Sequence, residues 1–238
     1  MAVDKLVDST QLDADLTSVA NAIRTKGGTS ANLAFPAGFV SAVQAIPSGG
    51  GVDWDAIASG DEPSGLITLQ VTAIAKSAFR AFQPSHSWSI YAPNALTIGD
   101  SAFRDNTNLS FVRFPRATSA PNGYVCYGTK NMTTVDVGKI SSIANQFFNM
   151  ASAFHTLIMR KSDGLTTLGN VNCFSSTYFA SGKSGGTIYI PKALYDHLGD
   201  GSALDYKAAT NWSTVNGYGT ITWAKLEGSQ YEDPDATW

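Results

Sequence analysis

The side chains that could do metal or cofactor chemistry are few in this sequence and stand far apart. The chain has three histidines, His86, His155 and His197, and none belongs to an H-x-x-x-H or C-x-x-C pattern. Metal sites in proteins usually draw their ligands from such closely spaced pairs. The sequence therefore predicts no metal site and no bound cofactor.

The two cysteines, Cys126 and Cys173, each precede an aromatic residue, Tyr127 and Phe174, that we expect in the core. A thiol in apolar surroundings packs as a small hydrophobic side chain and is unreactive. We therefore interpret both cysteines as buried packing residues. Two cysteines also exclude a disulfide-rich scaffold.

Patterns for catalysis are missing as well. No G-x-S-x-G elbow occurs, and Ser181–Gly186 (SGKSGG) lacks the spacing of a phosphate-binding loop and precedes a predicted strand. Acidic residues gather at 53–62 and 232–235, segments that we expect to be solvated and that offer no rigid cleft for paired carboxylates. We predict no catalytic residues and no enzyme activity; the alternative, a cell-wall hydrolase, would need a cleft with convergent titratable groups.

Composition and charge restrict the partners. Charged residues make up 15% of the 238 residues, and the net charge is −3. Binding to nucleic acid or to anionic membranes needs clustered Lys and Arg, so neither is expected. The first residues contain Asp4 and Asp8 and no apolar core, so we expect no signal peptide, no membrane insertion and synthesis in a cytosol.

The elements that must position any functional surface begin with a predicted helical hairpin at residues 1–47. The first helix follows the N-cap candidates Asp8–Thr10 and ends at Gly27–Gly28, and the second begins at Pro36. Each has one apolar stripe at helical spacing. The stripe residues, which we assign to anchoring or oligomerisation, are Leu12, Leu16, Val19, Ile23, Phe39, Val40, Val43 and Ile46.

So short a hairpin buries too little apolar surface to fold alone. We therefore expect its stripes to pack against other subunits or a partner protein; packing onto the rest of the chain is the alternative. Residues 48–65, which contain Gly49–Gly51 and several acids, are predicted to be a linker.

Residues 66–197 repeat with a period of about 23 residues. One series of aromatic residues consists of Phe79, Phe103, Tyr127, Phe148 and Phe174. A second, aliphatic series consists of Ile90, Val112, Val135, Leu157 and Ile188, with an insertion near Ser175–Gly186. Each repeat would give a short strand and a turn, and stacked repeats would share one continuous core. This predicts an α+β fold with a helical hairpin followed by a solenoid.

Alternation along each strand would place the neighbours of the aliphatic series on the outer face of the sheet. One such column is Tyr91, Arg113, Asp136, Ile158 and Tyr189, and its neighbour is Ser89, Phe111, Thr134, Thr156 and Thr187. Aromatic residues and Arg on a rigid sheet favour recognition of a partner. The predicted binding face is Tyr91, Phe111, Arg113, Asp136, Ile158 and Tyr189.

The segment IGDSAFRDNTNLSFVRFP resembles the BspA-like leucine-rich repeat, whose pattern is close to I-G-x-x-A-F-x-x-C-x-x-L-x-x-I-x-L-P. The resemblance covers roughly residues 66–191. The segments TIYIPKALYDHL and LDYKAATNWSTV resemble the end of such arrays, so residues 198–238 are expected to form a cap and tail. Separately, KLVDSTQLDADLTSVANAIRTKGGTS with LAFPAGFVSAVQAI resembles the N-terminal segment of tail or baseplate proteins of phages that infect Gram-positive gut bacteria.

These resemblances imply a non-enzymatic, receptor-binding phage tail or baseplate component, assembled in the host cytoplasm and located at the tail tip of the virion. Residues 1–47 would hold it to other tail proteins, and a homo-oligomer, with a trimer favoured, would match tail symmetry. The repeats would attach to a surface polysaccharide or protein of the host. The alternative is a bacterial surface adhesin or interaction module with the same repeats, which export signals would favour.

Overall fold

The computed structural model of the chain describes residues 13–21, 65–121, 123–163, 167–168, 171–180, 182–208 and 220–236. The chain divides into two compact units, Met1–Gly50 and Gly51–Trp238. Among the residues described, no helix has the length and apolar character needed to cross a bilayer.

In the first unit, residues 13–21 form a helix, which agrees with the first predicted helix. Leu16 is half-buried and Val19 is 48% exposed, while Ala20 is buried. The remaining stripe residues, Leu12, Ile23, Phe39, Val40, Val43 and Ile46, lie outside the described residues. The second helix lies outside them too, so the hairpin and its anchoring role stay predictions.

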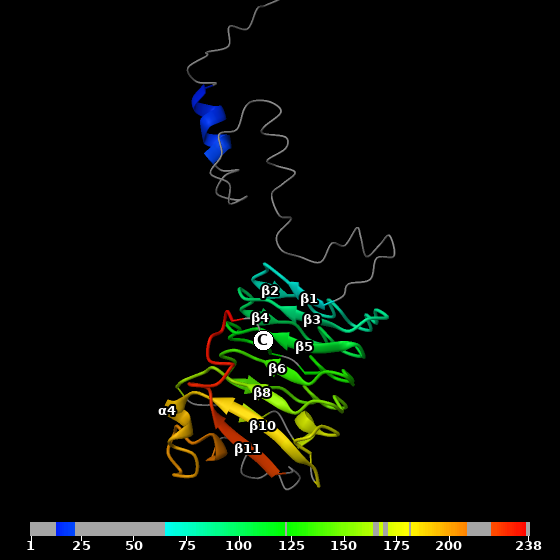
Figure 1. Cartoon of the computed structure of the whole chain (residues 1–238), viewed down its shortest axis with the longest axis vertical. Helices are drawn as coiled ribbons and strands as arrows, with labels where there is room; N and C mark the ends of the chain where they lie inside the picture. Colours follow the sequence, from blue (N-terminus) through cyan, green and yellow to red (C-terminus); the bar gives the residue numbers. More distant parts are fainter. Residues whose placement is uncertain are drawn as a thin grey trace, which may run out of the picture. The chain divides into compact units, whose positions relative to one another are not determined.

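The second unit is a stack of short strands and turns built around one parallel sheet of seven strands (Figure 1). In spatial order these strands are β1 (Gly65–Thr68), β3 (Trp88–Tyr91), β5 (Leu109–Arg113), β6 (Thr134–Asp136), β8 (Thr156–Ile158), β10 (Ser184–Ile190) and β11 (Thr220–Lys225). Two-residue strands form two further small sheets, β2 (Ala73–Ile74) with β4 (Thr97–Ile98) and β7 (Ser142–Ile143) with β9 (Thr167–Leu168). The helical pieces are η1 (Val171–Phe174), α4 (Lys192–Tyr195) and η2 (Tyr206–Ala208).

The aliphatic series has the predicted register. Ile90, Val112, Val135, Leu157 and Ile188 are paired from strand to strand, and all five are 0% exposed. Stacking therefore gives every repeat the apolar cover that it lacks alone, which confirms the predicted solenoid.

The aromatic series is confirmed at its ends and wrong in the middle. The rings of Phe79 and Phe103 are stacked with centroids 5.3 Å apart, and those of Phe148 and Phe174 are 5.4 Å apart. Between them, the core position belongs to Cys126, whereas Tyr127 is half-buried. Phe79 and Phe103 are 24 residues apart, whereas Phe103 and Cys126 are only 23 apart. A constant spacing of 24 from Phe103 therefore selects Tyr127, which is one residue too late.

The turns beside the residues of the aromatic series follow a recurring backbone pattern. Two residues four positions apart adopt the left-handed conformation in each of four repeats. The pairs are Ser77 and Ala81, Ser101 and Asp105, Tyr124 and Gly128, and Gln146 and Met150. This conformation costs energy in residues other than Gly. Hydrogen bonds to the next repeat offset the cost: the Ala81 N–H donates to the Arg104 carbonyl at 2.7 Å, and the Asp105 N–H donates to the Tyr127 carbonyl at 2.8 Å.

The last strand closes the array. β11 pairs in parallel with β10, and Trp223 on β11 packs its ring 5.9 Å from the buried ring of Tyr206. The chain then leaves β11 and turns back along the sheet (Figure 1).

Candidate functional site

The predicted outer column exists as one row of paired residues. Tyr91 pairs with Arg113, Arg113 with Asp136, Asp136 with Ile158, and Ile158 with Tyr189. The neighbouring column has the predicted pairing of Ser89, Phe111, Thr134, Thr156 and Thr187, but Ser89, Thr134 and Thr156 are buried. The strand period of two therefore places both sets on one face of the sheet.

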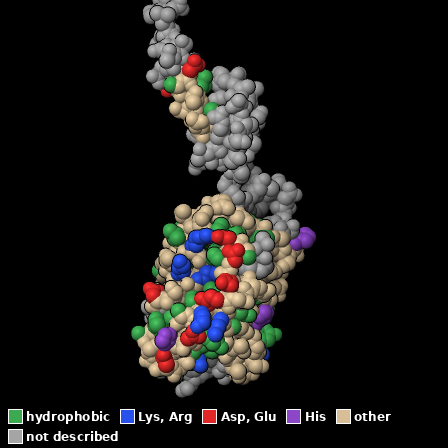
Figure 2. Space-filling view, turned by 60° about the vertical axis from the view of Figure 1, so that its left-hand side comes forward, with side chains coloured by type: hydrophobic (Ala, Val, Ile, Leu, Met, Phe, Trp, Pro, Cys, Tyr) green, Lys and Arg blue, Asp and Glu red, His purple; other side chains and the backbone are tan. Residues whose placement is uncertain are grey.

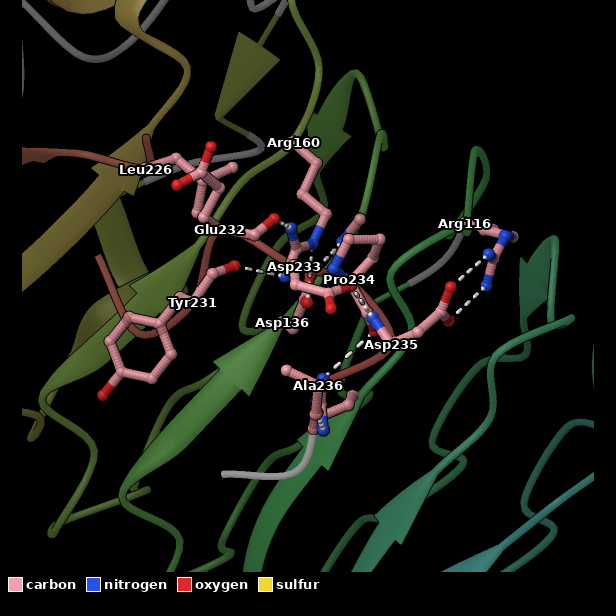
Figure 3. A network of polar contacts seen from close by, with 12 residues as sticks. Arg116, Asp136, Arg160, Leu226, Tyr231, Glu232, Asp233, Pro234, Asp235 and Ala236 are labelled. Atoms are coloured by element: carbon pink, nitrogen blue, oxygen red, sulfur yellow. Dashed lines mark hydrogen bonds and ion pairs between the residues drawn. The ribbon is translucent and has the colours of Figure 1, made fainter. Parts of the chain in front are cut away.

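The expectation that the first column faces solvent is wrong. Arg113, Asp136 and Ile158 are 0% exposed, and Tyr91, Tyr189 and Phe111 are half-buried. The first column is covered by residues 226–236, which we call the C-terminal strap. Residues 232–235 were expected to be solvated, but several residues of the strap bind the sheet (Figure 3). Whether the six predicted residues bind a partner stays a prediction.

Arg160, which follows β8, holds the first part of the strap. Its Nη2 donates to the Tyr231 carbonyl at 2.8 Å, and its Nη1 donates to the Glu232 carbonyl at 3.0 Å. Its Nε donates to Asp136 Oδ2 at 2.8 Å, and the Gly138 N–H donates to Oδ1 of the same carboxylate at 2.9 Å. The buried ion pair with Asp136 thus orients the Arg160 guanidinium, which bonds to the strap.

Arg113 and Arg116 hold the far end of the strap. Arg113 donates to the Ala236 carbonyl at 2.6 Å and to the Pro234 carbonyl at 3.1 Å. Arg116 forms a two-pronged ion pair with Asp235, with N–O distances of 2.9 and 2.8 Å (Figure 3). Such paired geometry is the strongest arrangement of Arg with a carboxylate.

Tyr91 completes this end. Its hydroxyl donates to Asp235 Oδ1 at 2.6 Å, and the Arg113 guanidinium lies 4.6 Å from the centre of its ring. Figure 2 shows the resulting mixture of basic and acidic side chains over one face of the second unit.

Apolar contacts hold the strap next to β11. Ile158, Leu226 and Tyr231 form a small buried cluster, against which Tyr189 packs. The rings of Tyr189 and Tyr231 meet edge to face with centroids 4.7 Å apart.

The electrostatics follow from these contacts. Hydrogen bonds from Arg116 and Tyr91 lower the pKa of Asp235 to about 2. Burial raises the pKa of Asp136, and the charge of Arg160 opposes that shift. Burial also lowers the pKa of Arg113, an effect partly offset by Asp136. At neutral pH, the exposed carboxyl of Asp235 is therefore ionised where it contacts Arg116 and Tyr91.

A second group of recognition-type residues lies on the turns and was missed from the sequence. The Arg104 guanidinium lies 5.1 Å from the ring centre of Tyr124 and 5.0 Å from that of Tyr127. The Tyr127 hydroxyl donates to Met150 Sδ at 3.0 Å, and Met150 is 44% exposed. We call these four residues the tyrosine–arginine cluster. The signal that could have found it is the shorter repeat, which moves Tyr127 out of the core.

The family follows from the repeats that carry both surfaces. The BspA type leucine rich repeat region matches residues 67–195 in six copies. The chain belongs to the BspA-type leucine-rich-repeat family. Searches of curated proteins and of solved structures found no match. BspA-type repeats point to an interaction or adhesin-type module, typically without enzyme activity.

The chemistry-bearing residues of this BspA-type array lie apart. Cys126 and Cys173 are both buried, and burial raises the pKa of the Cys126 thiol. The histidines have separate neighbours: His155 contacts Thr156, and His197 contacts Asp200. Within the described parts of the chain, no three His, Cys, Asp or Glu side chains are grouped to hold a metal ion.

Proposed function

We propose that this BspA-type protein is a non-enzymatic component of a phage tail tip or baseplate, and that its repeats bind the surface of the host bacterium. The observation that carries the binding part is the tyrosine–arginine cluster on the turns. The placement in the virion is supported by the resemblance of residues 5–46 to tail and baseplate proteins.

The tyrosine–arginine cluster has the composition of an interaction hot spot. Tyr, Arg and Met are enriched in the centres of protein interfaces, where they supply a large contact area. Hydrogen bonds between repeats fix the backbone beneath them, since the Phe103 N–H donates to the Val125 carbonyl and the Gly128 N–H to the Asn149 carbonyl. Binding would therefore order few additional groups, which favours affinity.

The chemistry of the cluster suits either a surface polysaccharide or a protein. Tyrosine rings stack on the apolar faces of sugars or on aromatic side chains, and the Arg104 guanidinium can donate to hydroxyl, carbonyl or carboxylate oxygens. Arg104 also pairs with the neighbouring Asp105 at 3.3 Å.

Residues 1–47 would attach the protein to the tail, with a trimer as the favoured assembly. The exposed Val19 and the half-buried Leu16 give this idea a direct test. The mass of the full chain, measured by light scattering, should be that of an oligomer. The double variant Leu16→Glu and Val19→Glu should be a monomer, and a monomeric wild type without affinity for any tail protein would refute the anchoring proposal.

The binding proposal is tested by adsorption of the purified full chain to host cells. Tyr124→Ala with Tyr127→Ala should weaken adsorption at least about tenfold, because truncation of a hot-spot residue costs more than about 1.4 kcal/mol. Tyr178→Ala is the matched control, since Tyr178 is a tyrosine that is 42% exposed and lies outside the cluster. Equal adsorption by all three proteins would exclude the cluster as the contact.

The second candidate is a bacterial surface adhesin or protein–protein interaction module, which the match to BspA-type repeats favours directly. The two functions differ in location. Antibody labelling of purified phage particles should decorate the tail tip under the first proposal, whereas labelling confined to bacterial cells would favour the second.

A further inference from the structure

We propose that the arginine-lined column beneath the C-terminal strap is a binding site for an acidic peptide in the turn-rich conformation of the strap, and that the strap of a second copy of the chain can occupy it. This site is separate from the tyrosine–arginine cluster and does not depend on the proposed host binding.

Most hydrogen bonds from the column go to main-chain carbonyls of its occupant. Arg160 donates to the carbonyls of Tyr231 and Glu232, and Arg113 donates to those of Pro234 and Ala236. The strap residues 226–236 form turns and bends, so the four contacts recognise carbonyls that this conformation presents to the sheet.

Two side chains add selectivity. Asp235 accepts hydrogen bonds from Arg116 and Tyr91, and the Tyr231 ring packs against Tyr189 and Ile158. The ligand class is therefore an acidic peptide that adopts the turns of the strap, with an aromatic residue followed, four positions later, by a carboxylate.

The charges of site and occupant are complementary. The site provides Arg113, Arg116 and Arg160, of which Arg160 is neutralised by Asp136. The strap contains no Lys or Arg, and its acidic residues are Glu227, Glu232, Asp233 and Asp235. Complementary charge favours encounter with acidic peptides over basic ones.

A second copy is the occupant that these observations support, because it carries the same segment and can reproduce every contact. The strap is joined to the array at β11. Its far end is held by two hydrogen bonds from Arg113 to main-chain carbonyls and by the Arg116–Asp235 pair, whose side chains are 43% and 53% exposed. Exposed ion pairs contribute little stability and are screened by salt. The far end can therefore open first, and exchange of an identical segment between copies is a low-cost route to dimers.

The first experiment uses the full chain and a fluorescent peptide with the sequence of residues 226–238. The variant Tyr231→Ala with Asp235→Asn loosens the chain's own strap and leaves the arginines intact. Fluorescence anisotropy should show at least tenfold tighter peptide binding to this variant than to wild type. Adding Arg113→Gln and Arg116→Gln should abolish binding, while the buried Arg160–Asp136 pair stays in place.

A scrambled peptide is the control. Absence of saturable binding, or equal binding of the scrambled peptide, would overturn the site. If the double variant does not show a cooperative thermal transition, Asp235→Asn alone repeats the test, since Asp235 is exposed and its loss should not unfold the array.

The second experiment tests the second copy as occupant. Full chains that carry only Arg113→Gln and Arg116→Gln keep an intact strap, and the strap-loosened chains keep an intact site. Mixing these two, with different tags, should give several times more mixed pairs by native mass spectrometry than mixing either variant with itself. Any association through residues 1–47 is the same in all mixtures, so it cannot produce this excess, and equal yields would overturn exchange between copies.

Discussion

Trp88 lies where the sheet absorbs an irregularity. Strand alternation places it on the inner face with Ile90, and it is 1% exposed. Trp88 pairs with Leu109 and Ser89 pairs with Phe111, so the pairing with β5 skips one residue of β5 at this point. Its indole Nε1 donates to Asn106 Oδ1 at 3.1 Å, so the polar atoms of both buried side chains are satisfied.

The core positions of the aromatic series give a prediction at the residue scale. Phe103→Ala should lower the free energy of unfolding by about 3–5 kcal/mol, because it leaves a cavity next to Phe79 and Phe114. Tyr127→Ala should cost clearly less, since Tyr127 is half-buried and lies outside the core. Urea unfolding of both variants checks this. Similar losses of unfolding free energy would contradict the assignment of Cys126 as the core residue of its repeat.

At the scale of elements, very short strands suffice because each repeat is bonded to its neighbours along the whole circuit. The turn after β6 is an example. Gly138 has φ +63°, its N–H donates to Asp136, and its carbonyl accepts from the Arg160 N–H. A Cβ built at Gly138 would lie 2.3 Å from the Phe114 carbonyl oxygen. This turn therefore connects three repeats at the point where the strap is anchored.

Gly138→Ala should destabilise the protein by clearly more than about 1 kcal/mol, since the substitution adds a steric conflict to an unfavourable backbone conformation. Gly182→Ala is the control, because Gly182 has a similar φ of +73° but open space around its Cβ position. Chemical denaturation of both variants measures the difference, which would vanish if backbone conformation alone mattered.

At the scale of the whole molecule, the strap ties β3 to β8 through contacts that depend on charge. The Asp235 pKa of about 2 lies below the ordinary value of about 3.9 for an unfolded chain. A lowered pKa in the folded state means that Asp235 stabilises the fold above about pH 4 and loses this effect as the pH falls towards 2.

We therefore expect wild type to melt at a higher temperature than Asp235→Asn at pH 6, and the difference to shrink to zero between about pH 4 and pH 2. Other carboxyl groups titrate alike in both proteins and cancel in the difference. Thermal unfolding followed by circular dichroism across this range is the measurement, and a difference that is constant with pH would show that the charge of Asp235 does not hold the strap.

The amino-acid sequence alone determined the solenoid, the register of Ile90 through Ile188 and the two outer columns. It could do so because apolar side chains must fill one core and strand geometry alternates faces with a period of two. Only the tertiary structure decided that the strap covers the first column, since arginines that donate to main-chain carbonyls leave no pattern in the sequence of their acceptors. It also decided that Cys126, and not Tyr127, fills the core position of its repeat. A repeat shortened by one residue is recognised only from the hydrogen bonds between neighbouring turns, because these show which residues of adjacent repeats pair.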